Sequence, residues 1–337
     1  IAREAIKYLV KDGRYDYIET GSLMSINANV KSINIPSEEH RIDMYPMDLE
    51  EFLWALGDDM MMDYVKECFT KRKPLGQSLH RKMMEYMRLY MIVGGMPQAV
   101  KDWVDTKDFD EVDRTKRNIL SLYRSDISKY ASSQEARVTK IFDTIPAQLQ
   151  KHEKKFRLSA LGKGTRSRNV ETAFFWLDES RVINTCFAAT EPTVGLEMRT
   201  DECSRKLYMA DTGLLISHAF SEAKIRAEEL YRKLMHDKLE LNKGMLVENI
   251  VAQMLRAAGH KLYFFSSYSK TDANERMEID FLVPKAILSN RHNIHPIEVK
   301  STTRYTLTSL ERFAKKYASA IAEPIVLHTA DVKVEDG

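Results

Sequence analysis

Two short strand-like segments near the C-terminal end of the sequence contain residues that could do chemistry. The first contains Glu278 and Asp280, and the second contains Glu298, Val299 and Lys300. Alternate side chains of a strand share a face, so Glu298 and Lys300 should point away from Val299. If the two strands are neighbours, carboxylates and an ammonium meet at one spot that can hold a hard divalent cation and a water. A metal-bound water is a nucleophile near neutral pH, and the metal offsets charge on a phosphate.

The same residues have plainer interpretations. Charged side chains on an edge strand commonly protect a sheet against aggregation. Glu298 and Lys300 could therefore be solvated edge charges or a surface ion pair. The fold could also be present with its catalysis lost.

The surrounding pattern predicts the elements that would position these residues. A helix begins near Lys243 and ends at Gly259, with apolar residues at helical spacing on one face. Strands are expected at Leu262–Ser266, Met277–Val283, Pro296–Ser301 and Pro324–Thr329, with a helix at Leu310–Ala320 before the last strand. The predicted order is α-β-β-β-α-β.

This order, with its Asp…Glu-x-Lys signature, resembles the restriction-endonuclease-like fold. The resemblance implies that Asp280, Glu298 and the Val299 carbonyl hold Mg²⁺ or Mn²⁺. It also implies that Lys300 steadies the attacking hydroxide and that Glu248, on the first helix, is an auxiliary catalytic acid.

Residues 133–217 show three helical segments followed by two strands, which is typical of a winged helix-turn-helix. The expected elements are helices at Val138–Leu149, just after Phe156–Ser159, and at Arg166–Asp178, then strands at Val182–Ala188 and Lys206–Ala210. In such a module the third helix meets the major groove of DNA. The basic residues expected to contact DNA are Lys154, Lys155, Lys163, Arg166 and Arg168. Alternatively, the module is a lid or a protein-docking unit, and this basic run is a solvated face.

In the N-terminal part, the sequence predicts further helices and a fragment of an α/β core. A helix is expected at Ala2–Val10, a short buried strand at Tyr15–Thr20, and long helices at Leu79–Val93 and Asp108–Tyr130. The segments Ile18–Ser22 and Met44–Phe52 look like the tail of an AAA-type ATPase core. The expected units are that tail (1–57), a helical block (58–132), the winged helix (133–217), a charged linker helix (218–241) and the nuclease-like domain (242–337).

Several motifs in a fixed order make the resemblance more specific. These are Gly94–Pro97, Leu122–Ile127, Ile145–Leu149, Lys206–Leu215, Gly244–Asn249, Glu278–Phe281 and Pro296–Ser301. Their combination resembles bacterial or archaeal AAA-type ATPases with a C-terminal domain of unknown function. Such a protein binds ATP in an N-terminal part, which the resemblance places upstream of Ile1. The given sequence has no G-x-x-x-x-G-K-[ST] loop, and Gly162–Thr165 is only superficially similar to one.

Composition limits the class of protein. The 337 residues, 44% hydrophobic and 30% charged, predict two or three globular domains of mixed α/β fold. No apolar run approaches the ~20 residues of a membrane span, so no membrane partner is expected. Cys68, Cys186 and Cys203 have neither disulfide nor zinc spacing, which fits a reducing cytoplasm.

Three functions follow as expectations. The first is an ATP-binding AAA-family protein whose C-terminal domain is a Mg²⁺-dependent nuclease acting on DNA. The second is a catalytically inert DNA- or protein-binding module that the ATPase controls. The third is a scaffold with no nucleic-acid partner, and a homo-oligomer is compatible with each of them.

Overall fold

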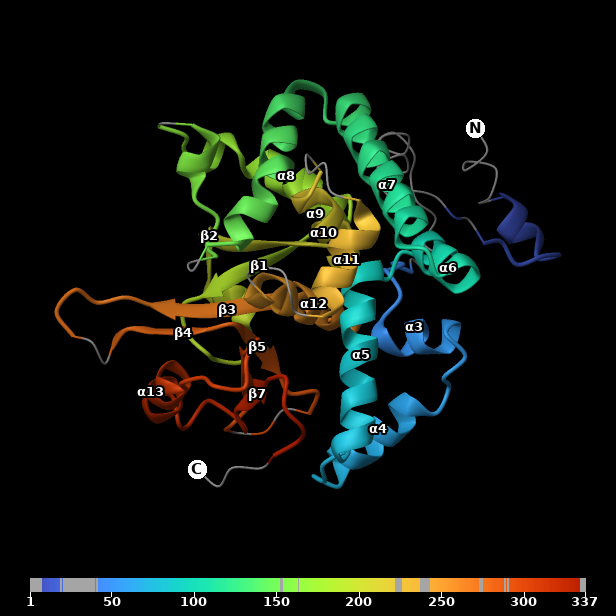
Figure 1. Cartoon of the computed structure of the whole chain (residues 1–337). Helices are drawn as coiled ribbons and strands as arrows, with labels where there is room; N and C mark the ends of the chain where they lie inside the picture. Colours follow the sequence, from blue (N-terminus) through green and yellow to red (C-terminus); the bar gives the residue numbers. More distant parts are fainter. Residues whose placement is uncertain are drawn as a thin grey trace.

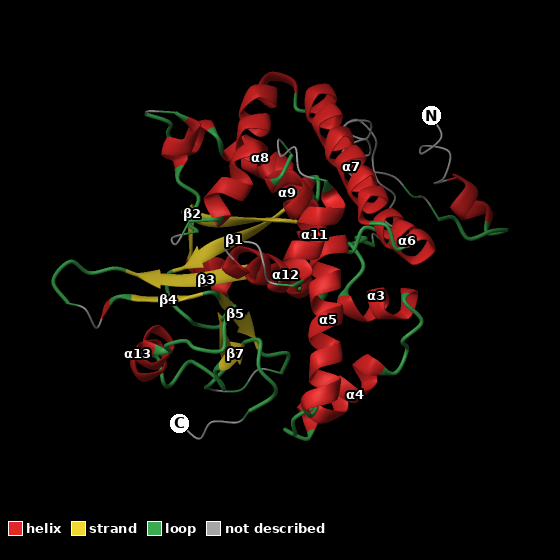
Figure 2. Cartoon of the chain, in the orientation of Figure 1, coloured by secondary structure: helices red, strands yellow, loops and turns green. Residues whose placement is uncertain are grey.

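The computed structural model is a mixed α/β arrangement in which most helices lie above and to one side of two small sheets (Figures 1 and 2). It describes residues 8–18, 20, 40, 42–151, 154–162, 164–221, 226–236, 243–272, 275–287, 289 and 291–333. No helix in these ranges is long and apolar enough to cross a membrane.

The first sheet has four strands in the order β2-β1-β3-β4. They are β1 (Ile183–Ala189), β2 (Thr200–Met209), β3 (Leu262–Ser267) and β4 (Met277–Ile279). β1 is antiparallel to β2 and parallel to β3, and β3 is antiparallel to β4. This sheet therefore joins strands from two distant parts of the chain.

The second sheet has three strands in the order β5-β6-β7. They are β5 (Phe281–Pro284), β6 (Ile294–Val299) and β7 (Ile325–Leu327). β5 is antiparallel to β6, and β6 is parallel to β7. With α12 (Lys243–Ala257) and α13 (Thr308–Lys316), the C-terminal elements follow the predicted order, except that the second predicted strand is divided.

That division falls at Asp280. The sequence predicts one strand at Met277–Val283, but β4 ends at Ile279 and β5 begins at Phe281 in the other sheet. Ile279 and Phe281 are both fully buried, one in each of two hydrophobic clusters, so the chain turns between two cores. Asp280 consequently lies at the corner where the sheets meet.

The two strands predicted as a wing do not form a separate ribbon. β1 is buried along almost its whole length and pairs with β3 as well as with β2. β1 thus lies inside the four-stranded sheet, between β2 and β3, whereas a wing would be a two-stranded ribbon of its own. Strands expected in the winged-helix unit (133–217) therefore share a sheet with strands of the C-terminal domain.

The helices expected in that unit are present in part. α8 (Glu135–Leu149) agrees with its prediction. The next two segments are short 3₁₀ turns at Leu158–Leu161 and Ser167–Asn169, and α9 (Glu171–Glu179) begins later than the predicted residue 166. Arg166 and Arg168 thus precede the third helix and do not lie on it.

The remaining helices pack as one block beside the sheets (Figure 1). They are α3 (Leu49–Ala55), α4 (Met61–Thr70), α5 (Gln77–Val93), α6 (Pro97–Thr106), α7 (Phe109–Tyr130), α10 (Thr212–Ala219) and α11 (Ala227–Met235). The predicted linker (218–241) contains α11, whose Leu230 and Tyr231 are buried against the main core. This part of the expected linker is therefore packed structure.

The described N-terminal residues differ from the predicted strand. Residues 8–12 are helical, in agreement with the expected helix. Residues 15–18 and 20 form no strand, and Tyr15 and Ile18 are 71% and 92% exposed. The buried strand predicted at Tyr15–Thr20 is thus wrong for the residues described there. Gly21 and Ser22 lie outside the described residues.

Candidate active site

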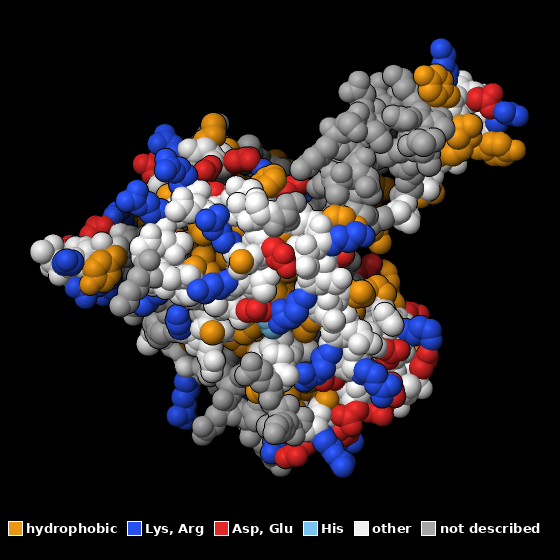
Figure 3. Space-filling view, turned by 90° about the horizontal axis from the view of Figure 1, so that it is seen from above, with side chains coloured by type: hydrophobic (Ala, Val, Ile, Leu, Met, Phe, Trp, Pro, Cys, Tyr) orange, Lys and Arg blue, Asp and Glu red, His pale blue; other side chains and the backbone are white. Residues whose placement is uncertain are grey.

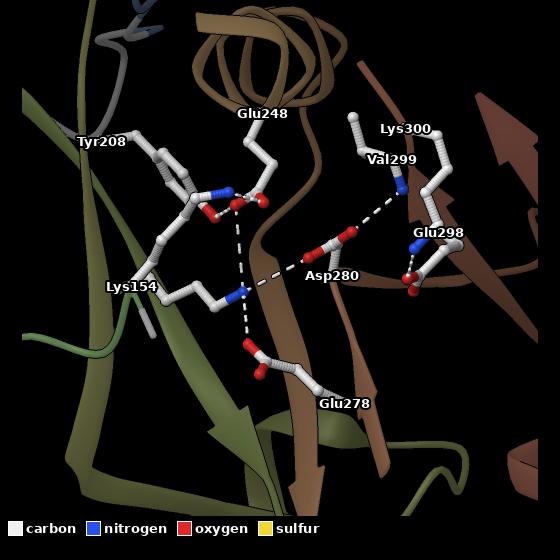
Figure 4. A network of polar contacts seen from close by, with 9 residues as sticks. Lys154, Tyr208, Glu248, Glu278, Asp280, Glu298, Val299 and Lys300 are labelled. Atoms are coloured by element: carbon white, nitrogen blue, oxygen red, sulfur yellow. Dashed lines mark hydrogen bonds and ion pairs between the residues drawn. The ribbon is translucent and has the colours of Figure 1, made fainter. Parts of the chain in front are cut away.

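The acidic residues singled out in the sequence come together around Asp280 (Figure 4). Glu248 projects from α12, Asp280 lies between β4 and β5, and Glu298 lies near the end of β6. The backbone N–H of Val299 donates to Asp280 Oδ2 at 2.9 Å, which joins the corner to β6. Glu248, Asp280 and Glu298 are each less than 10% exposed.

Lys206, on β2, lies among these carboxylates. Its Nζ is 2.9 Å from Glu278 Oε1, 3.4 Å from Asp280 Oδ1 and 3.9 Å from Glu248 Oε2. The lysine is only 1% exposed. Burial alone would lower the pKa of the Lys206 ammonium, but the three carboxylates outweigh that effect and raise its pKa well above the usual value. The charged form of Lys206 is therefore favoured in this centre.

Glu248 makes two further contacts. Its Oε1 forms an ion pair with Lys154, and its Oε2 accepts a hydrogen bond of 3.0 Å from the Tyr208 hydroxyl. Burial, followed by the charge of Asp280, raises the pKa of Glu248 above its ordinary value, although Lys206 and Lys154 oppose the shift. Each of its oxygens thus has a donor from outside the C-terminal elements.

Asn249 explains how β2 is held beside α12. Its side-chain amide accepts from Met209 N–H at 2.8 Å and donates to Met209 O at 3.1 Å. Asn249 is fully buried, so both bonds are shielded from water. This clamp on the last residue of β2 positions Lys206 and Tyr208 opposite Glu248.

Glu298 has one paired and one unpaired oxygen. Its Oε1 is 2.6 Å from Lys300 Nζ, as the shared strand face predicted. Its Oε2 is buried and has no hydrogen-bond partner in the described part of the chain. Burial, followed by the nearby Asp280 charge, raises the pKa of Glu298 to about 7.

The residues do not fit the metal site that the resemblance implies. Both Asp280 oxygens are engaged, one by Lys206 and one by the Val299 N–H. The backbone N–H of Val299 points into this centre, whereas the resemblance implied that the Val299 carbonyl would hold the metal. Lys300 is paired with Glu298. Mg²⁺ requires near-octahedral oxygen coordination, and no group of three or more His, Cys, Asp or Glu side chains within the described ranges is placed to hold a metal.

The residues predicted to contact DNA fall into different surroundings. Lys154 is largely buried in its ion pair with Glu248, so its ammonium does not face a DNA surface. Lys155 is half-buried, with its Nζ 6.0 Å from the centre of the Phe264 ring. Arg166 and Arg168 are exposed. Lys163 lies outside the described residues.

Sequence reasoning missed Lys206 and Tyr208 as members of this centre. They alternate along β2 with Leu207 and Met209, and all four are buried. A lysine inside a strand buried on both faces needs a carboxylate partner, because an unpaired buried charge is costly. A lysine in a buried strand therefore indicates a nearby carboxylate, once the strand is known to lie inside a sheet. The predicted wing would instead have left Lys206 in solvent.

Comparison with known families divides the chain into two parts. Residues 84–225 match the domain of unknown function DUF8612, and residues 243–337 match the domain of unknown function DUF4143. DUF4143 is a domain found at the C-terminus of AAA-ATPase-like proteins. No curated protein and no solved structure matches the chain. The matches agree with the C-terminal domain of unknown function that the sequence motifs indicated.

Proposed function

We propose that this chain is the DNA-binding part of an AAA-ATPase-like protein, and that its nuclease-like centre is catalytically inert and holds no metal ion. The observation that carries this proposal is the ammonium of Lys206 within 4 Å of three carboxylates. The single positive charge of this ammonium already offsets part of the negative charge of the carboxylates. The expected ATP site belongs to the ATPase part, outside the given sequence.

The charges of this centre are paired with one another. Three lysines, Lys154, Lys206 and Lys300, are paired with the acidic side chains of the centre. Removing one partner of such a pair leaves an uncompensated buried charge and costs ~3–5 kcal/mol. The network therefore favours a fixed centre that holds the two family regions together.

The DNA contact is assigned to the exposed cations that precede α9. Lys151, Arg157, Arg166 and Arg168 are all exposed. The face drawn in Figure 3 has Lys and Arg side chains interspersed with acidic ones. Because the net charge of the chain is only +2, binding to a polyanion depends on where the cations lie, and this segment carries four exposed ones.

A metal-dependent nuclease is the second candidate. It is favoured by the meeting of Glu248, Asp280, Glu298 and Lys300 at one place, as the resemblance implied (Figure 4). For this function, a divalent ion would have to displace Lys206 from Asp280, and DNA would have to reach side chains that are now buried.

A cleavage assay separates the two candidates. Plasmid and single-stranded DNA are incubated with Mg²⁺ or Mn²⁺ and with wild type, Asp280→Ala, Glu298→Gln or Glu311→Gln. The last variant changes an exposed acid on α13 and controls for net charge. We expect wild type to cleave no faster than any variant. Metal-dependent cleavage that is retained by Glu311→Gln and abolished in both site variants would establish the nuclease instead.

A further inference from the structure

A cavity of about 420 Å³, partly open to solvent, lies where several elements of the chain meet. Its walls come from α5, α11, the start of α12 and the segments that follow β6 and β7. The volume is in the range of small-molecule binding sites. Glu248, Asp280 and Glu298 are not among its described lining residues, so its walls are not those of the acidic centre.

The apolar part of the lining suits an alkyl chain. It consists of Met84, Met91, Ile92, Leu234, Leu246 and Val247. The two methionines have unbranched thioether chains that adapt to ligands of irregular shape. No aromatic side chain is among the described lining residues, so this part of the wall offers no ring on which a nucleobase could stack.

The polar part of the lining suits an anion. It consists of two cations and four hydroxyl-bearing side chains, namely Arg88, Lys243, Ser301, Thr302, Thr303 and Thr329. No Asp or Glu belongs to the lining within the described ranges. Guanidinium, ammonium and hydroxyl groups donate hydrogen bonds, and the charged donors bind carboxylates and phosphates most strongly. The lining is therefore complementary to an anion with an apolar body.

The smaller sheet explains why the hydroxyls gather at this edge. β6 and β7 run parallel with Val299 opposite Leu327, and the Lys300 N–H donates to Leu327 O at 2.8 Å. The chain therefore leaves both strands at the same edge, where Ser301 and Thr329 follow. The carboxyl ends of parallel strands are a common place for ligands in α/β sheets.

We propose that this cavity binds a small amphipathic anion, which has a carboxylate or phosphate head on an unbranched alkyl chain. The head lies beside Arg88 and Lys243, and the chain lies against the apolar residues. At ~30 Å³ for each water-sized group, about 420 Å³ holds roughly 14 such groups, which matches an alkyl chain of about ten carbons and its head. This site is additional to the DNA contact and does not rest on it.

The test measures binding of decanoate and decyl phosphate to the whole chain by calorimetry, with uncharged decanol as the control probe. At least one of the two anions should bind at a single site about tenfold more tightly than decanol, and the tighter one identifies the head group. Arg88→Gln with Lys243→Gln should weaken binding of that anion about tenfold and leave decanol binding nearly unchanged.

A matched control removes the same charge elsewhere. Arg81→Gln with Lys315→Gln changes exposed residues of α5 and α13 that are not among the lining residues, so the affinity for the anion should stay the same. A third variant, Val247→Phe, enlarges a half-buried side chain of the apolar wall and should abolish binding. The saturating anion should raise the melting temperature of wild type by ~5 °C and leave that of Val247→Phe unchanged.

Three results would overturn the proposal. The first is equal affinity for decanol and both anions. The second is binding of the anions that Arg88→Gln with Lys243→Gln leaves unchanged. The third is a homodimer in sedimentation that Val247→Phe dissociates and the anions do not, because the cavity would then hold a second copy of this chain.

Discussion

At the scale of single residues, the carboxylates of the centre differ in their partners. Lys154 and Tyr208 contact Glu248, Lys206 and Val299 contact Asp280, and Lys300 contacts Glu298. The Glu298–Lys300 contact follows from strand alternation and was predictable. The contacts of Lys154 and Lys206 join residues far apart in the chain, so they depend on sheet order, which local patterns do not specify.

The hydroxyl of Tyr208 should stabilise the fold through Glu248. Tyr208 is fully buried and donates to Glu248 Oε2 at 3.0 Å. Tyr208→Phe removes the donor but leaves the buried carboxylate, so we expect a loss of ~1–3 kcal/mol in the free energy of unfolding. Urea denaturation measures it. The control is Tyr268→Phe, at a side chain that is 73% exposed, where the change should be within ~0.5 kcal/mol. Equal effects in both variants would contradict the role of the buried bond.

At the scale of elements, the sequence predicted most helices, the C-terminal order and the positions of β1 and β2, but not the larger sheet that these two strands join. They were expected at Val182–Ala188 and Lys206–Ala210 and are found as β1 (Ile183–Ala189) and β2 (Thr200–Met209), but a local pattern does not reveal which other strands they pair with. The division at Asp280 was equally hidden, because Met277–Val283 has the continuous pattern of one strand. Burial of Ile279 and Phe281 in separate clusters explains the division, and only the tertiary structure shows it.

The end of α5 depends on Gly94. Its φ is +85°, and a Cβ atom there would overlap the Asp211 carboxylate, which caps α10. Gly57 has a similar φ of +81° but open space around the position of a Cβ. We expect Gly57→Ala to cost ~1 kcal/mol and Gly94→Ala ~3 kcal/mol or more in unfolding free energy. Thermal denaturation compares the two, and similar costs would mean that the packing against Asp211 is not tight.

The packing of α10 on α8 should make stability depend on pH. The His218 ring stacks on Phe142 with centroids 4.5 Å apart, and its Nε2 lies 3.6 Å from Asp143 Oδ1. Burial, followed by the charge of Arg124, lowers the pKa of His218 from 6.5 to about 4, while Asp143 opposes the shift. Below pH ~6.5 the unfolded chain takes up a proton that the folded protein binds only near pH ~4, so stability falls with falling pH in this window.

The size of this effect is open to measurement. His218→Gln should remove ~1–3 kcal/mol of the acid-induced loss between pH ~6.5 and pH ~4. Urea denaturation at several pH values gives the slope, with His236→Gln, at an exposed position, as the control. A slope that His218→Gln leaves unchanged would show that other groups cause the acid sensitivity.

At the scale of the whole molecule, the two family regions share one sheet and one charged centre. β1 and β2 lie within residues 84–225, and β3 and β4 lie within residues 243–337. A boundary predicted from composition separated these parts, because the intervening residues are rich in charge. Strand pairing and ion pairs connect the two regions. We therefore expect them to unfold as one cooperative unit.

Binding to DNA should depend on the exposed cations before α9. In a fluorescence titration with duplex DNA, Arg166→Ala with Arg168→Ala should make the slope of log K against log salt shallower by ~0.9 for each phosphate that is no longer neutralised. A double change of Lys71→Ala with Lys101→Ala removes the same charge from exposed residues at the end of α4 and on α6 and is the control. Equal slopes in both double variants would place the DNA surface elsewhere.

The position of a metal ion in the wild-type protein tests the central claim most directly. A crystal soaked in millimolar Mn²⁺ and measured at the manganese edge reveals any bound ion by its anomalous signal. The account predicts no manganese peak between Asp280 and Glu298, and density for the Lys206 ammonium in contact with Glu278 and Asp280. A manganese ion bound by Asp280 and Glu298, with Lys206 displaced, would contradict it.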